Sequence, residues 1–178
     1  LALGAHALTG GFEARDESLA DPGLPGGESV SRSRALFLQD ELAVTPSFNL
    51  TLGLRHDRYA LFGEEWSPRL YGVWQVDAAW TVKGGCSHGF KAPNLKQIVP
   101  GGRVEGPNTF LGNPALQPER SRGIELGVGY AAGATQAQLM VFDQRVDDVI
   151  EVQLVADGAV LGVGTYTDAH PARAGLGG

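Results

Sequence analysis

Residues 89–130 read GFKAPNLKQIVPGGRVEGPNTFLGNPALQPERSRGIELGVGY and contain the longest break between two predicted strands. One strand runs into this segment and reaches Phe90, and a second strand, in which apolar residues alternate with small or polar ones, leaves it at Ser121. Pro and Gly recur between the two strands, which is typical of a long loop. Shorter versions of this pattern, a strand, a connection and another strand, fill the rest of the chain.

A period of two dominates the sequence on both sides of this segment, as expected for strands with one apolar and one polar face. The clearest case is Phe48, Leu50, Leu52 and Leu54, which alternate with polar residues and one glycine. The other predicted strands lie at about 8–15, 33–44, 69–76, 80–87, 123–130 and 137–149. The sequence therefore predicts an all-β chain of about eight strands, although the two faces of the last segment cannot be told apart.

The predicted connections alternate in length. Short turns are expected at 45–47, 77–79 and 131–135, and long links at 19–30, 60–67 and 91–120. Short turns at one end and long loops at the other are typical of an antiparallel outer-membrane barrel, whereas a soluble sandwich has no reason to sort its loops in this way.

Aromatic residues support the membrane interpretation. Phe48, Trp74, Trp80 and Tyr130 all fall at the short-turn ends of their predicted strands. Trp and Tyr prefer the boundary between lipid and water, so these four residues are expected to form half of an aromatic girdle.

The polar faces of the predicted strands are rich in glycine, which bears on the size of the barrel. A small closed barrel has to fill its narrow interior with its own side chains. Gly53, Gly85, Gly123, Gly127 and Gly129 leave that space unfilled. We therefore predict an antiparallel transmembrane β-barrel segment that forms an arc of a wider barrel.

Composition excludes several other classes of protein. The 178 residues include 14 Lys and Arg against 20 Asp and Glu, a net charge of -6, and the basic residues are scattered, which argues against nucleic acid as a partner. No apolar run approaches the roughly 18 residues of a membrane helix. A single cysteine, Cys86, allows no internal disulfide. The chain starts at Leu1 without a recognisable signal peptide and ends on AGLGG, so we expect an internal fragment of a longer protein.

Several short motifs then form a recognisable series. FKAP occupies 90–93, and GNPALQPERS at 112–121 is followed by ELG at 125–127. Upstream lie LTLGLRHDRY, WSPRLYGVWQV and WTVKGG, in the same order and spacing, and FDQRVDDVI follows at 142–150. Over residues 37–166 the chain resembles TonB-dependent outer-membrane receptors, in particular the ferric catecholate siderophore and colicin receptors. The family pattern is not kept after Tyr166, where His170 and Pro171 depart from it.

The resemblance implies a barrel of about 22 strands, closed by an N-terminal plug domain, in the outer membrane of a Gram-negative bacterium. Such receptors import ferric siderophores with energy delivered from the inner membrane by TonB. Residues 1–178 would then be part of the barrel domain, lying in the lipid bilayer, and the plug domain and the TonB box would belong to the parent protein. We expect neither enzymatic activity nor a cofactor.

Recognition of an anionic ferric chelate would use guanidinium or ammonium groups with aromatic partners in the long loops. The candidates for ligand binding are Lys91, Lys96, Arg103, Phe110, Arg120 and Tyr59. A structural role is expected for the family-motif residues Phe90, Ala92, Pro93, Gly112, Asn113, Pro114, Leu116, Pro118, Glu119 and Glu125. Loop arginines such as Arg120 or Arg122 are expected to hold Glu119 and Glu125, and residues 99–110 would carry the specificity for the ligand.

Two other functions stay open at this point: the wall of a porin-like diffusion channel and a soluble all-β binding module. An enzyme is a poor third, because Cys86 and His88 share the apolar face of their strand and neither a nucleophile elbow nor a phosphate-binding loop occurs. The four histidines have no metal-ligand spacing, and Asp143, Asp147 and Asp148 lack the pattern of a calcium loop, so no metal site is predicted.

Overall fold

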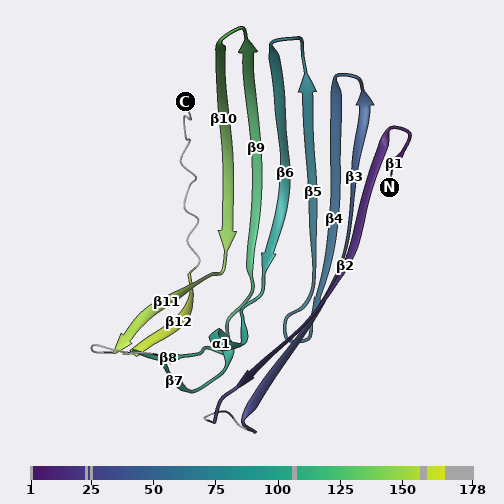
Figure 1. Cartoon of the computed structure of the whole chain (residues 1–178). Helices are drawn as coiled ribbons and strands as arrows, with labels where there is room; N and C mark the ends of the chain where they lie inside the picture. Colours follow the sequence, from purple (N-terminus) through teal and green to yellow (C-terminus); the bar gives the residue numbers. More distant parts are fainter. Residues whose placement is uncertain (1, 23, 25, 106–107, 157–159, 167–178) are drawn as a thin grey trace.

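The computed structural model describes the backbone of residues 2–22, 24, 26–105, 108–156 and 160–166, and the side chains of 4–22, 24, 26–101, 109–152 and 162–163. One antiparallel sheet of eight strands dominates it, in the order β1-β2-β3-β4-β5-β6-β9-β10 (Figure 1). Its strands are β1 (Ala2–Leu3), β2 (His6–Ala20), β3 (Glu28–Thr45), β4 (Phe48–Tyr59), β5 (Gly63–Gln75), β6 (Trp80–Lys91), β9 (Glu119–Ala132) and β10 (Thr135–Asp147). The predicted all-β fold is confirmed.

A second, smaller sheet was not predicted. It has the order β11-β12-β8-β7, with β7 (Gly102–Glu105), β8 (Asn108–Leu111), β11 (Val149–Ala156) and β12 (Val160–Tyr166). It lies at the long-loop end of the large sheet together with helix α1 (Leu95–Ile98), as Figure 1 shows. Because β12 pairs with β8 in parallel, the excursion between β6 and β9 is joined to the one that follows β10. We call these four strands the loop sheet.

The short turns lie where the sequence predicts them. Two residues, Pro46 and Ser47, connect β3 to β4, and comparably tight turns connect β5 to β6 and β9 to β10 at the same end of the sheet (Figure 1). At the opposite end the predicted long link at 60–67 is wrong, because β4 and β5 stay paired up to Tyr59 and Gly63. Gly63 has φ 78°, a left-handed conformation that glycine adopts without strain, and it closes this connection within residues 60–62.

The strand register separates two faces. On the outer face Leu54 lies between Leu38 and Pro68, and Leu126 lies between Gly84 and Val141. The apolar side chains of this face are exposed to the surroundings; Leu126, for example, is 54% exposed. In β10, whose faces the sequence left open, Leu139 and Val141 lie on the outer face opposite Val128 and Leu126.

Aromatic residues border the outer face on two levels. At the short-turn end, Phe48 pairs with Trp74 across β4 and β5, and the rings of Trp80 and Tyr130 lie 4.8 Å apart. The sequence reasoning missed the second level, where Trp66 packs on His56 with ring centroids 4.3 Å apart. Trp74 lies eight positions after Trp66 in β5, which is about 26 Å of strand and suits an apolar band of about 25 Å.

The inner face carries the polar and glycine residues of the alternating pattern. Several of its glycines have a close neighbour: a Cβ at Gly85 would fall on the carbonyl oxygen of Leu70, and one at Gly127 on the sulfur of Met140. These glycines therefore permit close packing within the wall, in addition to leaving the inner side of the arc open.

No helix among the described residues is long and apolar enough to cross a membrane. The departure from the family pattern at His170 and Pro171 lies outside the described residues.

One ion pair lies on the outer face, between the two aromatic levels. His6 Nδ1 is 2.7 Å from Asp40 Oδ2, and Asp40 pairs with Leu52 on one side and Leu8 on the other. The second carboxylate oxygen, Asp40 Oδ1, is buried without a hydrogen-bond partner. Loss of His6 would therefore leave a carboxylate unpaired among leucines.

We predict that Leu126→Arg destabilises the sheet in a lipid bilayer by about 2–4 kcal/mol, because a guanidinium on the outer face would lie in hydrocarbon. The matched control is Gln138→Arg, on the inner face, where the guanidinium stays in water and little change is expected. Urea unfolding from phospholipid vesicles measures both values. Equal tolerance of the two substitutions would contradict the assignment of the faces. Leu52 is less suitable for this test because an arginine there would meet Asp40.

We also predict that His6→Leu costs about 1–2 kcal/mol in the same measurement, since it leaves Asp40 charged and unpaired in an apolar environment. The double variant His6→Leu/Asp40→Leu should regain the stability of the parent. If His6→Leu alone has no effect, the His6–Asp40 pair does not contribute measurably to the stability of the wall.

Candidate functional site at the long-loop end

The excursion between β6 and β9 folds into a compact unit around α1. Asn94 caps the helix through a capping box, in which its side chain accepts a hydrogen bond from the Gln97 backbone N–H at 3.1 Å, and the Gln97 side-chain oxygen accepts one from the Asn94 backbone N–H at 3.0 Å. Leu95 and Leu116, each 1% exposed, are the two fully buried large side chains of the described residues. Leu95 N–H donates to Glu17 of β2, so this unit reaches the inner face of the wall near β2.

The GNP motif closes this unit. The backbone N–H of Asn113 donates to the Gln97 carbonyl at 2.7 Å, and its side-chain oxygen accepts from the Ala115 N–H at 2.9 Å. A Cβ at Gly112 would fall on the carbonyl oxygen of Val99, so only glycine fits there without a shift of the backbone. Two other motif residues, Pro93 and Pro118, are also buried. Residues 112–118 thus pack against α1 and Val99. Their structural role in the receptor stays a prediction.

Glu119 is the connection between the wall and the loop sheet. Both oxygens of its carboxylate accept a hydrogen bond from Lys91 Nζ at 3.1 Å, and Oε1 also accepts one from the backbone N–H of Ile150 in β11 at 3.0 Å. The expectation that a loop arginine holds Glu119 is therefore wrong. Lys91 is the nearer cation, because it is the cross-strand partner of Glu119 at the last pair of the β6–β9 ladder.

The candidate ligand residues are found in different surroundings. Arg120 Nε is 3.0 Å from Glu65 Oε2, so Arg120 and Lys91 both have a carboxylate partner already. Lys96 is exposed on α1, and Phe110 is half-buried on β8. The side chain of Arg103 lies outside the described residues. The structure brings Lys91 and Arg120 to the same end of the wall, where each has its own carboxylate partner.

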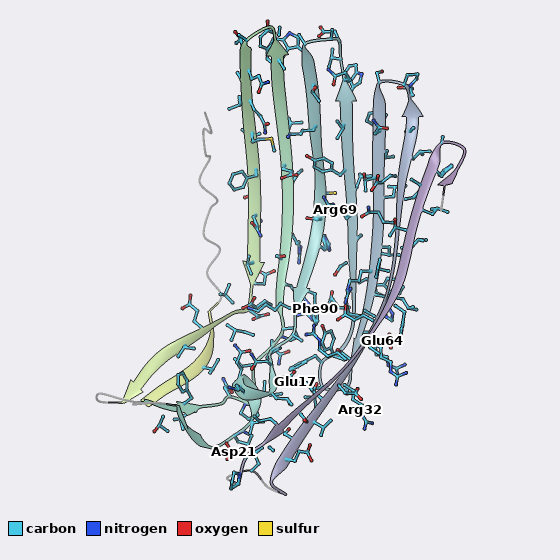
Figure 2. All side chains as sticks on the ribbon, viewed as in Figure 1. Glu17, Asp21, Arg32, Glu64, Arg69 and Phe90 are labelled. Carbon is cyan, nitrogen blue, oxygen red and sulfur yellow. The ribbon has the colours of Figure 1, made fainter. Side chains whose placement is uncertain are left out.

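Tyr59 lies beyond the level of Trp66 and packs against Phe90, with ring centroids 5.3 Å apart. Burial is the larger cause that raises the pKa of the Tyr59 hydroxyl above its ordinary value, and the nearby guanidiniums of Arg55 and Arg15 act in the opposite direction. Figure 2 shows Phe90, Glu17, Arg32 and Glu64 at this end of the sheet, whereas Arg69 lies further along the strands. Tyr59 and Phe90 thus form an aromatic pair at the long-loop end.

A charged network on the inner face was missed by the sequence analysis. Glu13, Ala35, Asp57 and Glu65 lie side by side in one row across β2 to β5. Arg55 donates three hydrogen bonds to Asp57 at 2.9–3.1 Å and one to Glu13 at 3.1 Å. This bridge passes over the small side chain of Ala35, which is 4% exposed, while Asp57 is 5% exposed. Alternation alone marked Arg55 and Asp57 as polar, and only the register shows that Glu13 is their neighbour.

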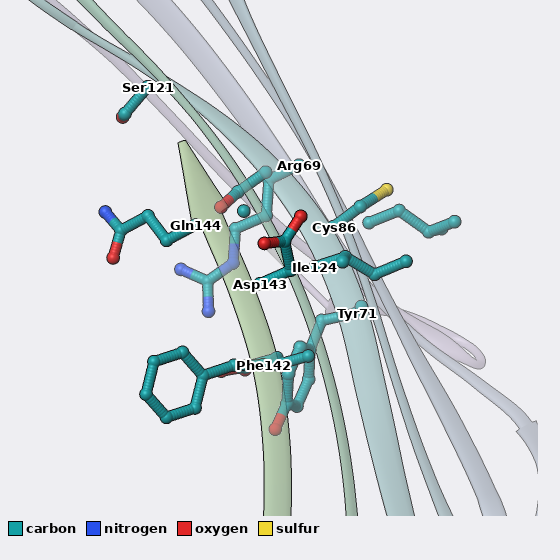
Figure 3. Close-up of a pocket in the computed structure, with 13 residues that line it drawn as sticks. Arg69, Tyr71, Cys86, Ser121, Ile124, Phe142, Asp143 and Gln144 are labelled. Atoms are coloured by element: carbon teal, nitrogen blue, oxygen red, sulfur yellow. The ribbon is translucent and has the colours of Figure 1, made fainter. Parts of the chain in front are cut away.

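A cavity of about 200 Å³ lies further down the wall. Gly85 and Gly123 leave room for it, and the guanidinium of Arg69 lies over the ring of Tyr71, 5.8 Å from its centre. In Figure 3 the side chains of Arg69, Tyr71 and Gln144 point to one side of the sheet, and those of Cys86 and Ile124 to the other. Glu125 and Asp143 also line the cavity, so its lining carries one guanidinium and two carboxylates.

In the part of the chain that the structure describes, no three His, Cys, Asp or Glu side chains are grouped so that they could hold a metal ion. Asp143 lies within 3.5 Å of Arg145, and Asp148 has φ 57° at the point where the chain passes from β10 to β11. Asp143 is therefore paired with an arginine of its own strand, and Asp148 lies at the bend that follows β10.

Comparison with known proteins identifies the family. The model of the TonB dependent receptor-like β-barrel matches residues 4–172. The chain belongs to the TonB-dependent receptors. It is 41% identical over 154 residues to the iron-regulated outer membrane virulence protein of Vibrio cholerae, covering 83% of this chain and 24% of that protein. It is 34% identical over 169 residues to the ferric enterobactin receptor of Pseudomonas aeruginosa, covering 86% and 23%.

Solved structures of TonB-dependent receptors share the fold. The siderophore receptor PirA of P. aeruginosa superposes with a TM-score of 0.77 at 31% identity, over 91% of this chain and 31% of that one. A variant of the P. aeruginosa ferric enterobactin receptor, solved in complex with enterobactin, gives 0.74 at 27% identity, over 94% and 30%. The transmembrane barrel-segment fold is therefore confirmed. The chain spans about a quarter of the length of the curated relatives it matches.

We predict that Gly112→Ala destabilises the excursion between β6 and β9 by about 1–3 kcal/mol, because the added methyl group would displace the backbone of Val99. Gly123→Ala is the matched control, since the nearest atom to its new Cβ would be Ser87 Oγ at 3.8 Å. Amide hydrogen exchange at Val99 and Asn113 reports the opening of this unit. Unchanged protection in Gly112→Ala would show that the excursion tolerates the shift.

Proposed function

We propose that this chain is the wall segment of an outer-membrane receptor that takes up a ferric siderophore in a TonB-dependent manner. The segment supplies one arc of the barrel and, between β6 and β9, one of the loops at the mouth. Residues 1–178 are then part of the barrel domain. The plug domain and the contact with TonB belong to other parts of the receptor, and the protein is a transporter with no enzymatic activity.

The observation that carries this proposal is the FKAP and GNP series in its folded setting. The same residues that mark the family pack Leu95 and Leu116 into the core of the excursion and bring Glu119 to the junction of wall and loop sheet. A plain channel wall has no need for a loop built to this degree of order. The relatives named above support a siderophore as the ligand class, and ferric enterobactin is the chelate named for one of them.

The cations at the mouth are already paired with carboxylates of the protein, so an anionic chelate would compete with these carboxylates for them. Lys91 and Arg120 each have one carboxylate partner at 3.0–3.1 Å, but the Lys91 side chain stays exposed and that of Arg120 is only half-buried. An anion that arrives at the mouth can therefore share these cations, since exposed pairs are worth about 0–1 kcal/mol each. The candidate contacts Lys91, Lys96, Arg103, Phe110, Arg120 and Tyr59 belong to this proposal.

The porin-like alternative predicts diffusion without energy coupling, and the soluble-module alternative predicts a compact monomer without detergent. The 54% exposed Leu126 and its neighbours on the outer face favour a membrane wall over a soluble module.

The test is uptake of radiolabelled iron by iron-starved cells that express the intact receptor carrying this segment. With ferric enterobactin as the probe, we expect saturable uptake that is abolished in cells without TonB. Uptake that is linear in concentration and equal in both strains would favour the porin-like alternative. The same cells with the empty expression vector provide the background.

A further inference from the structure

Arg15 is a well-exposed cation of the inner face near the long-loop end. Its Nη2 lies 3.6 Å from Glu13 Oε1, beyond hydrogen-bond distance, and its side chain is 71% exposed. The other guanidinium on Glu13 is that of Arg55, which is 36% exposed and donates four hydrogen bonds to Asp57 and Glu13. Arg55 thus donates hydrogen bonds to both carboxylates of the network, and Arg15 is left with one weak partner.

The register places aromatic groups beside Arg15. Arg15 pairs with Ser33 and Ser33 with Tyr59, so the three lie in one row on the inner face, next to the row of Glu13, Ala35 and Asp57. The small side chain of Ser33 separates the guanidinium from the phenol. Phe90 packs on Tyr59 from the start of the long excursion, with ring centroids 5.3 Å apart. The positive charge of Arg15 opposes the rise in the pKa of the Tyr59 hydroxyl, so the guanidinium interacts electrostatically with the phenol.

An exposed guanidinium beside a tilted pair of aromatic rings suits one chemical class of ligand. A guanidinium attracts anions and can donate two parallel hydrogen bonds to neighbouring oxygens. Aromatic side chains stack on flat rings and also attract the guanidinium itself. A ferric complex whose donor groups are catecholates offers both features, because its oxygens carry the negative charge and its rings form the outer surface.

We propose that Arg15, with Tyr59 and Phe90, forms a contact site on the inner face for an anionic ferric chelate with aromatic donor groups. This inference rests on the proposed function and adds the residues and the ligand class that it leaves open. Arg15 contacts the chelate directly, Tyr59 and Phe90 present the stacking surface, and Arg55 with Asp57 keeps Glu13 from closing fully on Arg15.

The chain offers a close control for Arg15. Arg58 is 74% exposed, and its Nε lies 3.5 Å from Glu64 Oε1, so it has nearly the same exposure and the same kind of partner. It pairs with Arg34 and Glu64 on the outer face, so it points away from the inner side of the wall. Substitution of either arginine removes one positive charge near the long-loop end.

The experiment measures equilibrium binding to the intact receptor in detergent, by quenching of its tryptophan fluorescence. The probes are ferric enterobactin, an anionic triscatecholate, and a ferric trihydroxamate that carries no net charge. We expect Arg15→Gln to weaken binding of the triscatecholate about tenfold or more and Arg58→Gln to leave it within about twofold. Arg15→Lys keeps the charge but loses the paired donors, so we expect an intermediate loss. Tyr59→Ala should also weaken binding, whereas Tyr59→Phe, which keeps the ring, should retain it.

Three results would overturn the inference. The first is unchanged triscatecholate binding by Arg15→Gln and Arg15→Lys, with both variants folded as judged by their heat-dependent mobility on electrophoresis. The second is an equal loss in Arg15→Gln and Arg58→Gln, which would point to the overall charge of the loop end. The third is binding of neither chelate by the parent receptor, which would remove the proposed function as well, whereas the first two leave that function standing.

Discussion

The antiparallel hydrogen-bond ladder between neighbouring strands is the constraint on which the rest of the structure depends. In hydrocarbon, backbone N–H and C=O groups have no water to pair with, so a strand is stable there only between two others in continuous register. The inner strands of the large sheet, β3, β4, β5, β6 and β9, meet this demand because each is paired on both sides, and the register assigns the residues of the paired stretches to two faces. The leucines of the outer face, the glycines of the inner face and the rows of charge at the mouth all follow from it.

The ladder also extends past the apolar band. β3 is 18 residues long and β2 is 15, while a tilted strand needs about 9–11 residues to cross a bilayer. The inner-face network of Glu13, Arg55 and Asp57 lies at the level of Trp66, where the apolar band ends, so the polar chemistry of this segment is built on wall strands as well as on loops. Strands hold side chains more firmly than loops do, so the geometry of this network is well defined.

The sequence was sufficient for the parts of the structure that local patterns govern. Alternation from Phe48 to Leu54 predicts the faces of β4, and Trp74 and Trp80 mark the short-turn end. It failed where one residue changes a connection, as Gly63 does at the β4–β5 turn. It also failed where partners lie far apart: Glu13 and Arg55, or β12 and β8, are brought together by the register of the whole sheet. The partner of Glu119 was wrongly expected to be an arginine close in sequence, because the cross-strand Lys91 is visible only once β6 and β9 are paired.

The parallel pairing of β12 with β8 has a consequence for how such receptors diversify. Residues 92–118 and 148–166 leave the wall at different points, yet they share one set of backbone hydrogen bonds and meet again at Glu119. Neither segment can be replaced alone without leaving strand edges unpaired. The two segments therefore form one structural unit, and an exchange of one of them between related receptors would require the exchange of the other.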